Sequence, residues 1–336
     1  MRILVLGGTA FLGRAHVAEA LRRGHHVTTF NRGRTWPDLP GVEVVRGDRT
    51  EEADLERLRA GRWDVVVDTS GYVPRVVGKA AAALRKVAPV YVFASTASVY
   101  ADRPRLPIDE DSRVHECAPD AGPDDGDYGT RKAGCERAVL DHYGDSALIQ
   151  RLGVIVGPHE DVGRLPWWLS RIERGGEVLA PGSPSVPMQL VDVRDVATFT
   201  FDRLERGEGG VFNVGAPQGH PTFGALLSHG LDVTASAARL VWVDDDFLLA
   251  NDVTIWSELP LWAPMNEACG AAWQMSTTRA ERAGLRCRPI RETIADTWAL
   301  MREGWEARPR PELPKLGIDP DKEQRILAAW HARAGV

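Results

Sequence analysis

The sequence predicts an α/β protein with a doubly wound parallel sheet and a smaller, mixed C-terminal domain. Three observations predict this fold class. Short β-branched runs alternate with helical patterns through the first 150 residues. A glycine-rich turn, residues 7–13, separates the first of these runs from the first helical pattern. Beyond residue 158 the alternation loosens, and most of the eleven tryptophans lie there.

The glycine turn follows the apolar run 3–6 and precedes a helical pattern. Strand, glycine turn and helix in this order indicate a dinucleotide site. Gly7 permits the tight turn, Gly8 lets the main chain approach a pyrophosphate, and Gly13 lets the helix lie close to the strand. The helix N-terminus offers N–H groups to the phosphates. An ordinary glycine-rich loop is the alternative. The residues expected to contact the cofactor here are Gly7, Gly8, Thr9, Ala10, Phe11, Leu12 and Gly13.

Each of the next predicted strands also ends in polar residues or glycine. Strands are expected over 26–30, 42–45, 63–68 and 90–94, and helices over 55–58 and 76–87. The residues at these strand ends are Asn31, Arg32, Asp48, Thr69, Ser70, Gly71, Ser95 and Thr96. Ligands of doubly wound sheets bind at the carboxyl ends of the strands, near the switch in strand order. The set therefore favours nucleotide binding over an ordinary loop.

The rest of the chain divides at changes of pattern. A Pro- and Asp-rich loop is expected over 102–127, then a helix from residue 128 and a strand from residue 147. We expect a nucleotide-binding domain over 1–157 and about 189–215, and a substrate domain over 158–188 and about 216–305. A Pro-rich linker and a last amphipathic helix would occupy 306–336. The aromatic residues Trp242, Trp256 and Trp262 are expected in the core or at an interface more than on a ligand.

The composition limits which classes of partner and which location we expect. The formal net charge of -6 gives no electrostatic reason to expect nucleic acid or an anionic membrane. No apolar run approaches the length of a membrane span or a signal-peptide core, so the cytoplasm is the expected location. The four cysteines form no Cys-x-x-Cys pair, and residues 244–246 lack the spacing of a metal loop. We therefore expect reduced thiols and no metal.

Tyr128 and Lys132 lie at i and i+4, hence on one face of the predicted helix. A phenol is a poor acid or base at neutral pH, but a neighbouring ammonium group favours the phenolate. Such a tyrosine can exchange a proton with a carbonyl or alcohol while hydride moves to or from a nicotinamide. The hydroxyl of Thr96 can hydrogen-bond the same substrate oxygen. Alone, a Tyr-x-x-x-Lys spacing is common on solvated helices, and its position in the α/β pattern favours the catalytic interpretation.

These motifs resemble the extended short-chain dehydrogenases/reductases, the family of NAD-dependent epimerases and dehydratases with a Rossmann fold. The resemblance covers about residues 1–215. It implies that Thr96 is the hydroxyl residue of the family's Ser-Ser-x-x-Val-Tyr string. It also implies that Tyr128 is the acid/base and that Lys132 holds the nicotinamide ribose.

The same resemblance places Asp48 at the adenine and the stretch 151–158, beginning with Arg151, over the nicotinamide. Ala10 stands where the family usually has a glycine. At the end of the second strand the family has an Asp for the ribose diol, whereas this chain has Asn31, followed by Arg32 and Arg34. Losing a carboxylate and gaining guanidinium groups favours the 2′-phosphate of NADP, with NAD as the alternative.

Two further departures separate the chain from typical members. The fourth strand ends in Asp-Thr-Ser-Gly, which resembles an atypical branch with a Gly-Gly-Thr-x-Phe-Leu-Gly opening that includes chloroplast RNA-binding relatives. Gly153 and Met188 stand where members that act on sugar nucleotides have Asn and Arg. Because methionine cannot bind a phosphate, a sugar-nucleotide substrate is less favoured.

The sequence thus predicts an NADP-preferring oxidoreductase for a small-molecule carbonyl or secondary alcohol. One alternative is an epimerase or dehydratase that uses tightly held NAD. Another is a non-catalytic cofactor- or RNA-binding relative, against which the acidic balance and the complete Thr96, Tyr128 and Lys132 set argue. Members of the family often form homodimers through the helix that bears the Tyr and Lys, so the resemblance also admits a homodimer.

Overall fold

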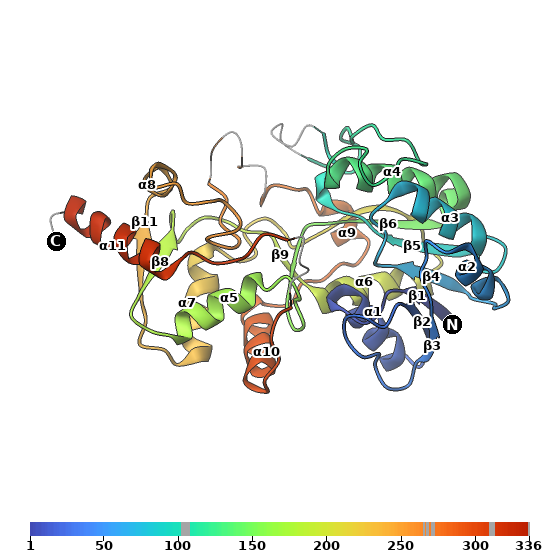
Figure 1. Cartoon of the computed structure of the whole chain (residues 1–336), viewed down its shortest axis with the longest axis horizontal. Coiled ribbons are helices and arrows are strands. Elements are labelled where there is room, and N and C mark those ends of the chain that lie inside the picture. Colours follow the sequence, from blue (N-terminus) through green and yellow to red (C-terminus); the bar gives the residue numbers. More distant parts are fainter. Residues whose placement is uncertain (102–107, 265, 267–268, 270–272, 309–312, 335–336) are drawn as a thin grey trace. The chain divides into compact units, whose positions relative to one another are not determined.

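The computed structural model describes residues 1–101, 108–264, 266, 269, 273–308 and 313–334. The chain divides into two compact units (Figure 1). The first holds Met1–Ile155, Val193–Pro217 and Met275–Cys287, and the second holds Val156–Asp192, Gln218–Gln274 and Arg288–Val336. The sequence had placed 275–287 in the second region and the C-terminal helix apart, so the division differs there. Part of the expected linker and of the loop 102–127 lies outside the described residues.

A seven-stranded sheet forms the centre of the first unit, and all its neighbouring strands are parallel. Its order is β10-β6-β5-β4-β1-β2-β3. The strand order reverses between β1 and β4, which confirms the predicted doubly wound fold. The strands are β1 (Arg2–Leu6), β2 (His26–Asn31), β3 (Glu43–Arg46), β4 (Val65–Asp68), β5 (Val90–Ala94), β6 (Ala147–Leu152) and β10 (Gly210–Val214).

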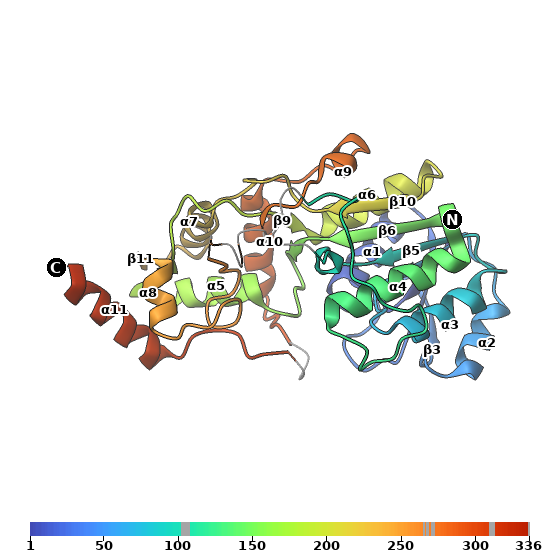
Figure 2. The same ribbon diagram turned by 90° about the horizontal axis from the view of Figure 1, so that it is seen from above.

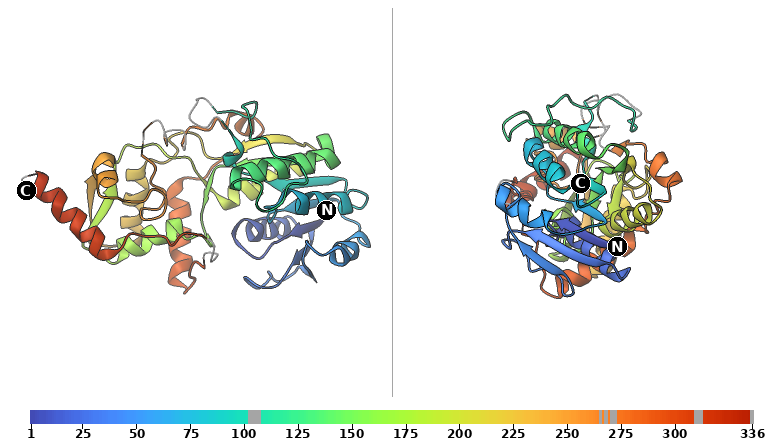
Figure 3. Two further views of the ribbon diagram at one scale, coloured as in Figure 1. Left: turned by 45° about the horizontal axis from the view of Figure 1, so that its top comes forward. Right: turned by 90° about the vertical axis from the view of Figure 1, so that its right-hand side faces the viewer.

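Helices cover both faces of this sheet (Figures 1 and 2). On one face α1 (Phe11–Arg22) packs beside α6 (Val193–Glu205). On the other, α3 (Pro74–Leu84) packs between α2 (Glu52–Arg59) and α4 (Tyr128–Tyr143). Figure 3 shows the same layers from two further sides. The remaining short elements are η1 (Ala97–Val99), η2 (Gly144–Ser146), β7 (Val154–Val156) at the first passage to the second unit, and α9 (Thr278–Arg282).

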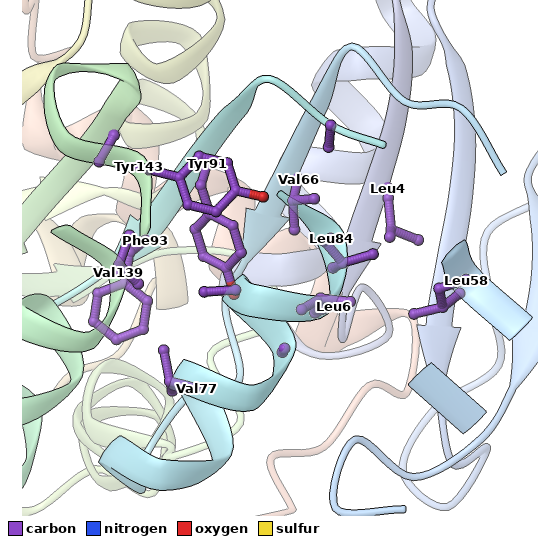
Figure 4. Close-up of a cluster of buried hydrophobic side chains, with 14 of the residues drawn as sticks. Leu4, Leu6, Leu58, Val66, Val77, Leu84, Tyr91, Phe93, Val139 and Tyr143 are labelled. Atoms are coloured by element: carbon purple, nitrogen blue, oxygen red, sulfur yellow. The ribbon is translucent and has the colours of Figure 1, made fainter. Parts of the chain in front are cut away.

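The core under α3 shows how the sequence pattern makes these layers. Val77, Ala80, Ala81 and Leu84 follow at the spacing of one helix face, and all four are fully buried. Figure 4 shows Leu84 in one cluster with Val66 and other side chains of the sheet. Burying a leucine contributes roughly 1.5–3 kcal/mol. Pro74 at the first helical position fits because its missing N–H has no partner there anyway.

The second unit has a mixed fold of its own. Its helices α5, α7 and α10 pack on one another, and β8 pairs with β11 in parallel. Trp262 is buried, whereas Trp242 and Trp256 are half-buried. Among the described residues no helix is long and apolar enough to cross a membrane. The elements are α5 (Arg164–Glu173), β8 (Glu177–Pro181), β9 (Leu190–Asp192), α7 (Phe223–Thr234), β11 (Arg239–Val243), α8 (Asp245–Ala250), α10 (Ile290–Arg302) and α11 (Pro320–Ala334).

The C-terminal helix α11 is anchored within the second unit. The guanidinium of Arg171 in α5 contacts both carboxylate oxygens of Glu323 at 2.8 and 3.0 Å, and both side chains are buried. Glu323 also accepts a hydrogen bond from the main-chain N–H of Leu179 in β8. In this buried pair the N–H at Arg171 Nε is shared by both carboxylate oxygens, and with the further main-chain donor neither charge is left unpaired. The helix is therefore part of this unit rather than a detached tail.

Candidate active site

The glycine turn has the shape that a pyrophosphate cradle needs. Gly7 and Gly8 have φ of 112° and 97°, which side-chain-bearing residues rarely adopt. A Cβ on Gly8 would stand 2.9 Å from Thr29, and one on Gly13 would stand 2.7 Å from the nitrogen of Gly8. Helix α1 begins at Phe11, and Ala10, its N-cap residue, makes no side-chain capping bond. The first N–H groups of α1 therefore remain for an anion.

Residues that follow β4 lie beside the glycine turn and contact it. Ser70 donates its hydroxyl hydrogen to the carbonyl of Leu6 at 3.0 Å, and a Cβ on Gly7 would lie 2.9 Å from the Thr69 hydroxyl. Asp68 is fully buried and forms a bidentate pair with Arg49 at 2.7 Å on both oxygens. Sequence reasoning missed this pair, because Arg49 gave no signal apart from following Asp48. The buried pair fixes the strand end that carries Thr69 and Ser70.

Asn31, at the end of β2, is bonded within the protein. Its amide nitrogen donates to the Asp38 carboxylate at 2.8 Å, and its oxygen accepts from Arg46 and from the main-chain N–H of Gly33. Asp38 also pairs with Arg46 at 2.6 Å and accepts from the Thr29 hydroxyl. The loop after β2 thus brings the carboxylate of Asp38 next to Asn31, the residue that stands where the family has an Asp. Neither Asp38 nor Arg46 was expected there.

Arg32 and Arg34 are exposed next to this network. A guanidinium nitrogen of Arg32 lies 3.8 Å from the Asp48 carboxylate. The pKa of Asp48 lies below its ordinary value, first because the N–H and hydroxyl of Thr50 donate to it, and further because Arg32 and Arg34 are near. With Arg46, three guanidinium groups gather at the ends of β2 and β3. Two carboxylates lie among them, because Asp38 pairs with Arg46 and Asp48 lies near Arg32.

Lys132 of α4 is buried at the carboxyl ends of β4 and β5. Its ammonium donates to the carbonyl of Gly71 at 2.9 Å and to the carbonyl of Ala94. Burial, which disfavours the charged form, lowers the pKa of Lys132 to about 8. An ammonium has three N–H donors, so two carbonyl acceptors leave one for a ligand. The sequence predicts Lys132 itself in the site, and the structure places its charge between the ends of the two strands.

Tyr128 is the first residue of α4, and its side chain is 45% exposed. The helix begins here because the Asp127 carboxylate accepts from the N–H of Thr130 at 2.8 Å, which caps the first turn. The ring centroids of Tyr128 and Tyr72 are 6.4 Å apart. Tyr72, which follows Gly71, was not among the expected site residues. A phenol in the first turn of α4 is open to a small molecule.

Thr96 is the N-cap residue of η1, and its hydroxyl oxygen accepts from the N–H of Ser98 at 3.2 Å. A hydroxyl that accepts one hydrogen bond can still donate one. The turn that follows packs against the first turn of α4, because Gly129 has no side chain to hold it away. Thr96 and Tyr128 therefore belong to adjoining segments.

Ser95 and Arg151 lie in a buried polar network. The Ser95 hydroxyl donates to Glu136 of α4, and Arg151 pairs with the same carboxylate at 2.9 Å. Arg151 also donates to the Tyr100 hydroxyl at 3.1 Å and to the carbonyl of Glu110. These bonds orient both side chains toward protein groups. Their expected contacts with a cofactor stay predictions, and Glu136 is a member of the network that the sequence did not reveal.

The residues present fit a bound dinucleotide. A Cβ would fill the space at Gly7, Gly8 and Gly13, and the N-terminus of α1 adjoins that space. Within the part of the chain that the structure describes, no group of three His, Cys, Asp or Glu side chains has the placement of a metal site. The four cysteines, all within the described residues, are not joined in disulfides.

Comparisons with known proteins found a matching family model and two similar relatives. The family model described as "NAD dependent epimerase/dehydratase family" matches residues 3–215. The chain is 28% identical over 242 residues to the chloroplast stem-loop binding protein of 41 kDa b of Arabidopsis thaliana, which covers 67% of this chain and 61% of that protein. It is 28% identical over 215 residues to 2′-dehydrokanamycin reductase of Streptomyces kanamyceticus, covering 61% and 58%. The chain thus spans about three fifths of these relatives.

Solved structures show the same fold. The UDP-glucose 4-epimerase of Thermotoga maritima, solved with UDP-glucose, matches 91% of this chain and 100% of its own, with a TM-score of 0.69 and 19% identity. WbmG of Bordetella bronchiseptica, solved with NAD, matches 90% and 94%, with a TM-score of 0.67 and 20% identity. At such identities the likeness establishes the fold and no more.

Proposed function

Because the chain belongs to the NAD dependent epimerase/dehydratase family, we propose that it transfers a hydride between a nicotinamide cofactor and a small-molecule carbonyl or secondary alcohol. The position of Lys132 carries the proposal. A buried ammonium, held by the carbonyls of Gly71 and Ala94, lies one helical turn from the exposed phenol of Tyr128. Burying a cation costs several kcal/mol unless hydrogen bonds or an opposite charge compensate for the lost water. Charged groups held in such surroundings are common at functional sites, so the placement of Lys132 supports a catalytic role.

The bound cofactor supplies or accepts the hydride, and the protein handles the proton. Tyr128 gives a proton from its hydroxyl oxygen to the substrate oxygen during reduction and takes it back during oxidation. Lys132 stabilises the phenolate through its positive charge and offers its third N–H to a ribose hydroxyl. The Thr96 hydroxyl donates to the same substrate oxygen and so orients it. Gly7, Gly8 and the N-terminus of α1 would hold the pyrophosphate.

We favour net reduction of the substrate over an epimerase or dehydratase reaction, in which the cofactor gives the hydride back to the same substrate. One relative is by its name a reductase, and Met188 cannot bind the diphosphate of a sugar nucleotide. If instead the purified protein carried tightly bound NAD and consumed no added NADPH, an epimerase or dehydratase would be indicated. Salt-sensitive RNA binding without cofactor turnover would indicate a non-catalytic RNA-binding protein; the chloroplast relative is by its name a stem-loop binding protein.

The cofactor that this site favours is NADP. Arg32 and Arg34 are exposed at the end of β2, and Arg46 lies at the end of β3 beside Asn31. Guanidinium groups bind phosphate through paired, charge-assisted hydrogen bonds, which suits the 2′-phosphate. The family as a whole is NAD-dependent by its description. Preference for NADP is therefore the part of the proposal specific to this chain.

Turnover of NADPH with a panel of ketones tests the proposed function. Tyr128→Phe and Lys132→Met should each lower kcat about 10²–10⁴-fold, the usual contribution of a positioned acid/base. Tyr143→Phe is the matched control: it changes a tyrosine at the other end of α4, whose buried hydroxyl has no hydrogen-bond partner among the described residues. Its kcat should equal that of the wild type. Wild-type rates in Tyr128→Phe would refute the proposal.

A further inference from the structure

Tyr72 occupies a fixed place in the connection between β4 and α3. It follows Gly71, where a Cβ would stand 2.7 Å from both Phe93 and Val77, so this backbone is tightly enclosed. Two residues later Pro74 begins α3. Tyr72 is 39% exposed, so its ring is only partly covered by the protein. A rigid backbone with a partly exposed ring suits a residue that orients its neighbours.

The ring of Tyr72 faces the ammonium of Lys132. The Lys132 nitrogen lies 5.5 Å from the centroid of the Tyr72 ring and 4.1 Å from that of Phe93. Two aromatic rings and the two carbonyls of Gly71 and Ala94 therefore surround the cation. The face of an aromatic ring attracts a cation within about 6 Å of its centroid. The Phe93 ring is buried, so Tyr72 forms the outer side of this enclosure.

The same ring contacts the phenol of Tyr128. The two tyrosine rings are tilted by 40° with centroids 6.4 Å apart, within the range of favourable aromatic pairs. Tyr72 thus contacts both members of the proposed proton-transfer pair. Tyr128 and Lys132 come from α4, whereas Tyr72 comes from the end of β4. Their relative placement therefore depends on a residue outside the helix that bears them.

We propose that Tyr72 is a positioning residue, whose ring stabilises the charged Lys132 and orients the Tyr128 phenol for proton transfer. This inference rests on the proposed function. Both contacts that carry this inference are made by the ring. Phenylalanine at this position should therefore preserve it, whereas an aliphatic side chain of similar bulk should not.

The groups that face Lys132 set the direction of the expected change. Burial lowers its pKa most; Asp68 of β4 and Cys135 and Glu136 of α4 raise it, and Arg49 lowers it. The ring of Tyr72 adds attraction for the ammonium form. Replacing the ring with leucine removes that attraction while keeping apolar bulk against water. The titration midpoint of Lys132 should therefore fall.

Lysine side-chain NMR measures this midpoint directly. The chain has five lysines, and the Lys132 signal is the one absent from Lys132→Met. The midpoint in Tyr72→Phe should match the wild type, and in Tyr72→Leu it should be lower by about half a pH unit. An unchanged or raised midpoint in Tyr72→Leu, or an equal fall in Tyr72→Phe, overturns the positioning role.

Steady-state kinetics give the second readout. Tyr72→Leu should lower kcat about 10-fold with little change in KM, and Tyr72→Phe should restore it. A raised KM with unchanged kcat would mean that Tyr72 only binds substrate, which also overturns the inference. The NMR titration needs neither cofactor nor substrate. Full turnover by Tyr128→Phe would instead overturn the proposed function, so the two failures are distinguishable.

Discussion

Gly129 of α4 lies against the carbonyl oxygen of Ser98 in η1, so close that a Cβ on Gly129 would stand 2.1 Å from that oxygen. Real Cβ atoms do not approach an oxygen so closely. Ser98 lies in the turn that Thr96 caps, and Gly129 follows Tyr128. The absence of one side chain thus allows the two hydroxyl-bearing segments of the proposed site to adjoin.

Gly129→Ala should therefore separate these segments. We expect the free energy of unfolding to fall by about 1–3 kcal/mol, as for other overpacked sites, despite the higher helix propensity of alanine. Turnover should fall more than stability alone explains, because Thr96 and Tyr128 would no longer share one substrate oxygen. Urea unfolding and kcat measured on the same preparation check this.

Gly78→Ala in α3 is the matched control. Its nearest neighbours would be Ala138 and the carbonyl of Pro119, at 3.5 and 3.6 Å, which are ordinary contacts. This variant should be as stable as the wild type or up to about 1 kcal/mol more stable. If Gly129→Ala behaved like Gly78→Ala, the contact with Ser98 would have no structural importance.

The fold was predictable because its signals are local. The periodicity of each strand and helix, like the glycine turn, is determined by neighbouring residues in the sequence. The carboxyl ends of parallel strands also meet at one edge of a sheet, which brings their polar residues together. The placement of Tyr128 and Lys132 on one helix was predictable for the same reason, since they are one helical turn apart, whereas their roles stay predictions. What these residues contact across the sheet was not local information.

The partners of Asn31 show this limit. Sequence reasoning treated it as the end of a strand, with Arg32 and Arg34 beside it. The structure adds Asp38, returned by a loop, and Arg46 from the next strand. No pattern in the sequence marks either residue, because the contact depends on the path of an irregular loop. Tyr72 was missed likewise, since its role depends on a lysine sixty residues later in the chain.

Replacing both Arg32 and Arg34 with alanine should weaken NADPH binding. We expect Kd for NADPH to rise about 10- to 100-fold, as paired charge-assisted bonds are lost, and Kd for NADH to stay within about twofold. Fluorescence titration of each cofactor measures both. Arg59→Ala on α2 is the control, because Arg59 is also exposed and, among the described residues, pairs with Glu56 on the same helix, away from the end of β2.

The structure also offers an explanation for a preference for NADH over NADPH. If NADH binds more tightly than NADPH and the double variant changes neither, the preference for NADP is wrong. Asp38→Asn should then weaken NADH binding, because its carboxylate would be the acceptor that Asn31 does not supply.

Asp68→Asn should strongly destabilise the first unit. The change leaves the guanidinium of Arg49, whose side chain is only 11% exposed, without its counter-charge, and breaking such a largely buried pair costs about 3–5 kcal/mol. Glu56→Gln, which breaks the exposed pair with Arg59, should change the free energy of unfolding by less than about 1 kcal/mol. Chemical denaturation at neutral pH compares the two. Equal effects would mean that the Arg49–Asp68 pair is not a structural support.

The same pair gives a pH dependence. Burial alone would raise the pKa of Asp68, but the charge of Arg49 and the hydrogen bonds from Arg49, Tyr91 and Ser70 hold it below its ordinary value. A lowered carboxyl pKa contributes stability above its unfolded pKa, about 4, and that stability is lost as pH falls through the folded value. The wild type should therefore lose stability below pH 4 more steeply than Asp68→Asn.

His16 should produce a second loss of stability, at higher pH. It is buried in α1, where its ring nitrogens contact the carbonyl of Leu12 and the hydroxyl of Thr200 at 2.8 and 2.9 Å. Burial lowers the pKa of His16 to about 4. Because the unfolded chain binds a proton near pH 6.5 and the folded chain does not, the free energy of unfolding should fall between pH 6.5 and 4.

The size of this fall follows from the difference between the two pKa values. It corresponds to about 3 kcal/mol at pH 4, at roughly 1.4 kcal/mol per pH unit. His16→Gln keeps a polar side chain but cannot titrate, so its unfolding free energy should fall less over this window. His26→Gln makes the same replacement at the exposed start of β2 and is the control that is compared with the wild-type slope. If His16→Gln kept that slope too, the proton uptake would have to belong to other groups, and His16 would not be the neutral, buried histidine that its surroundings require.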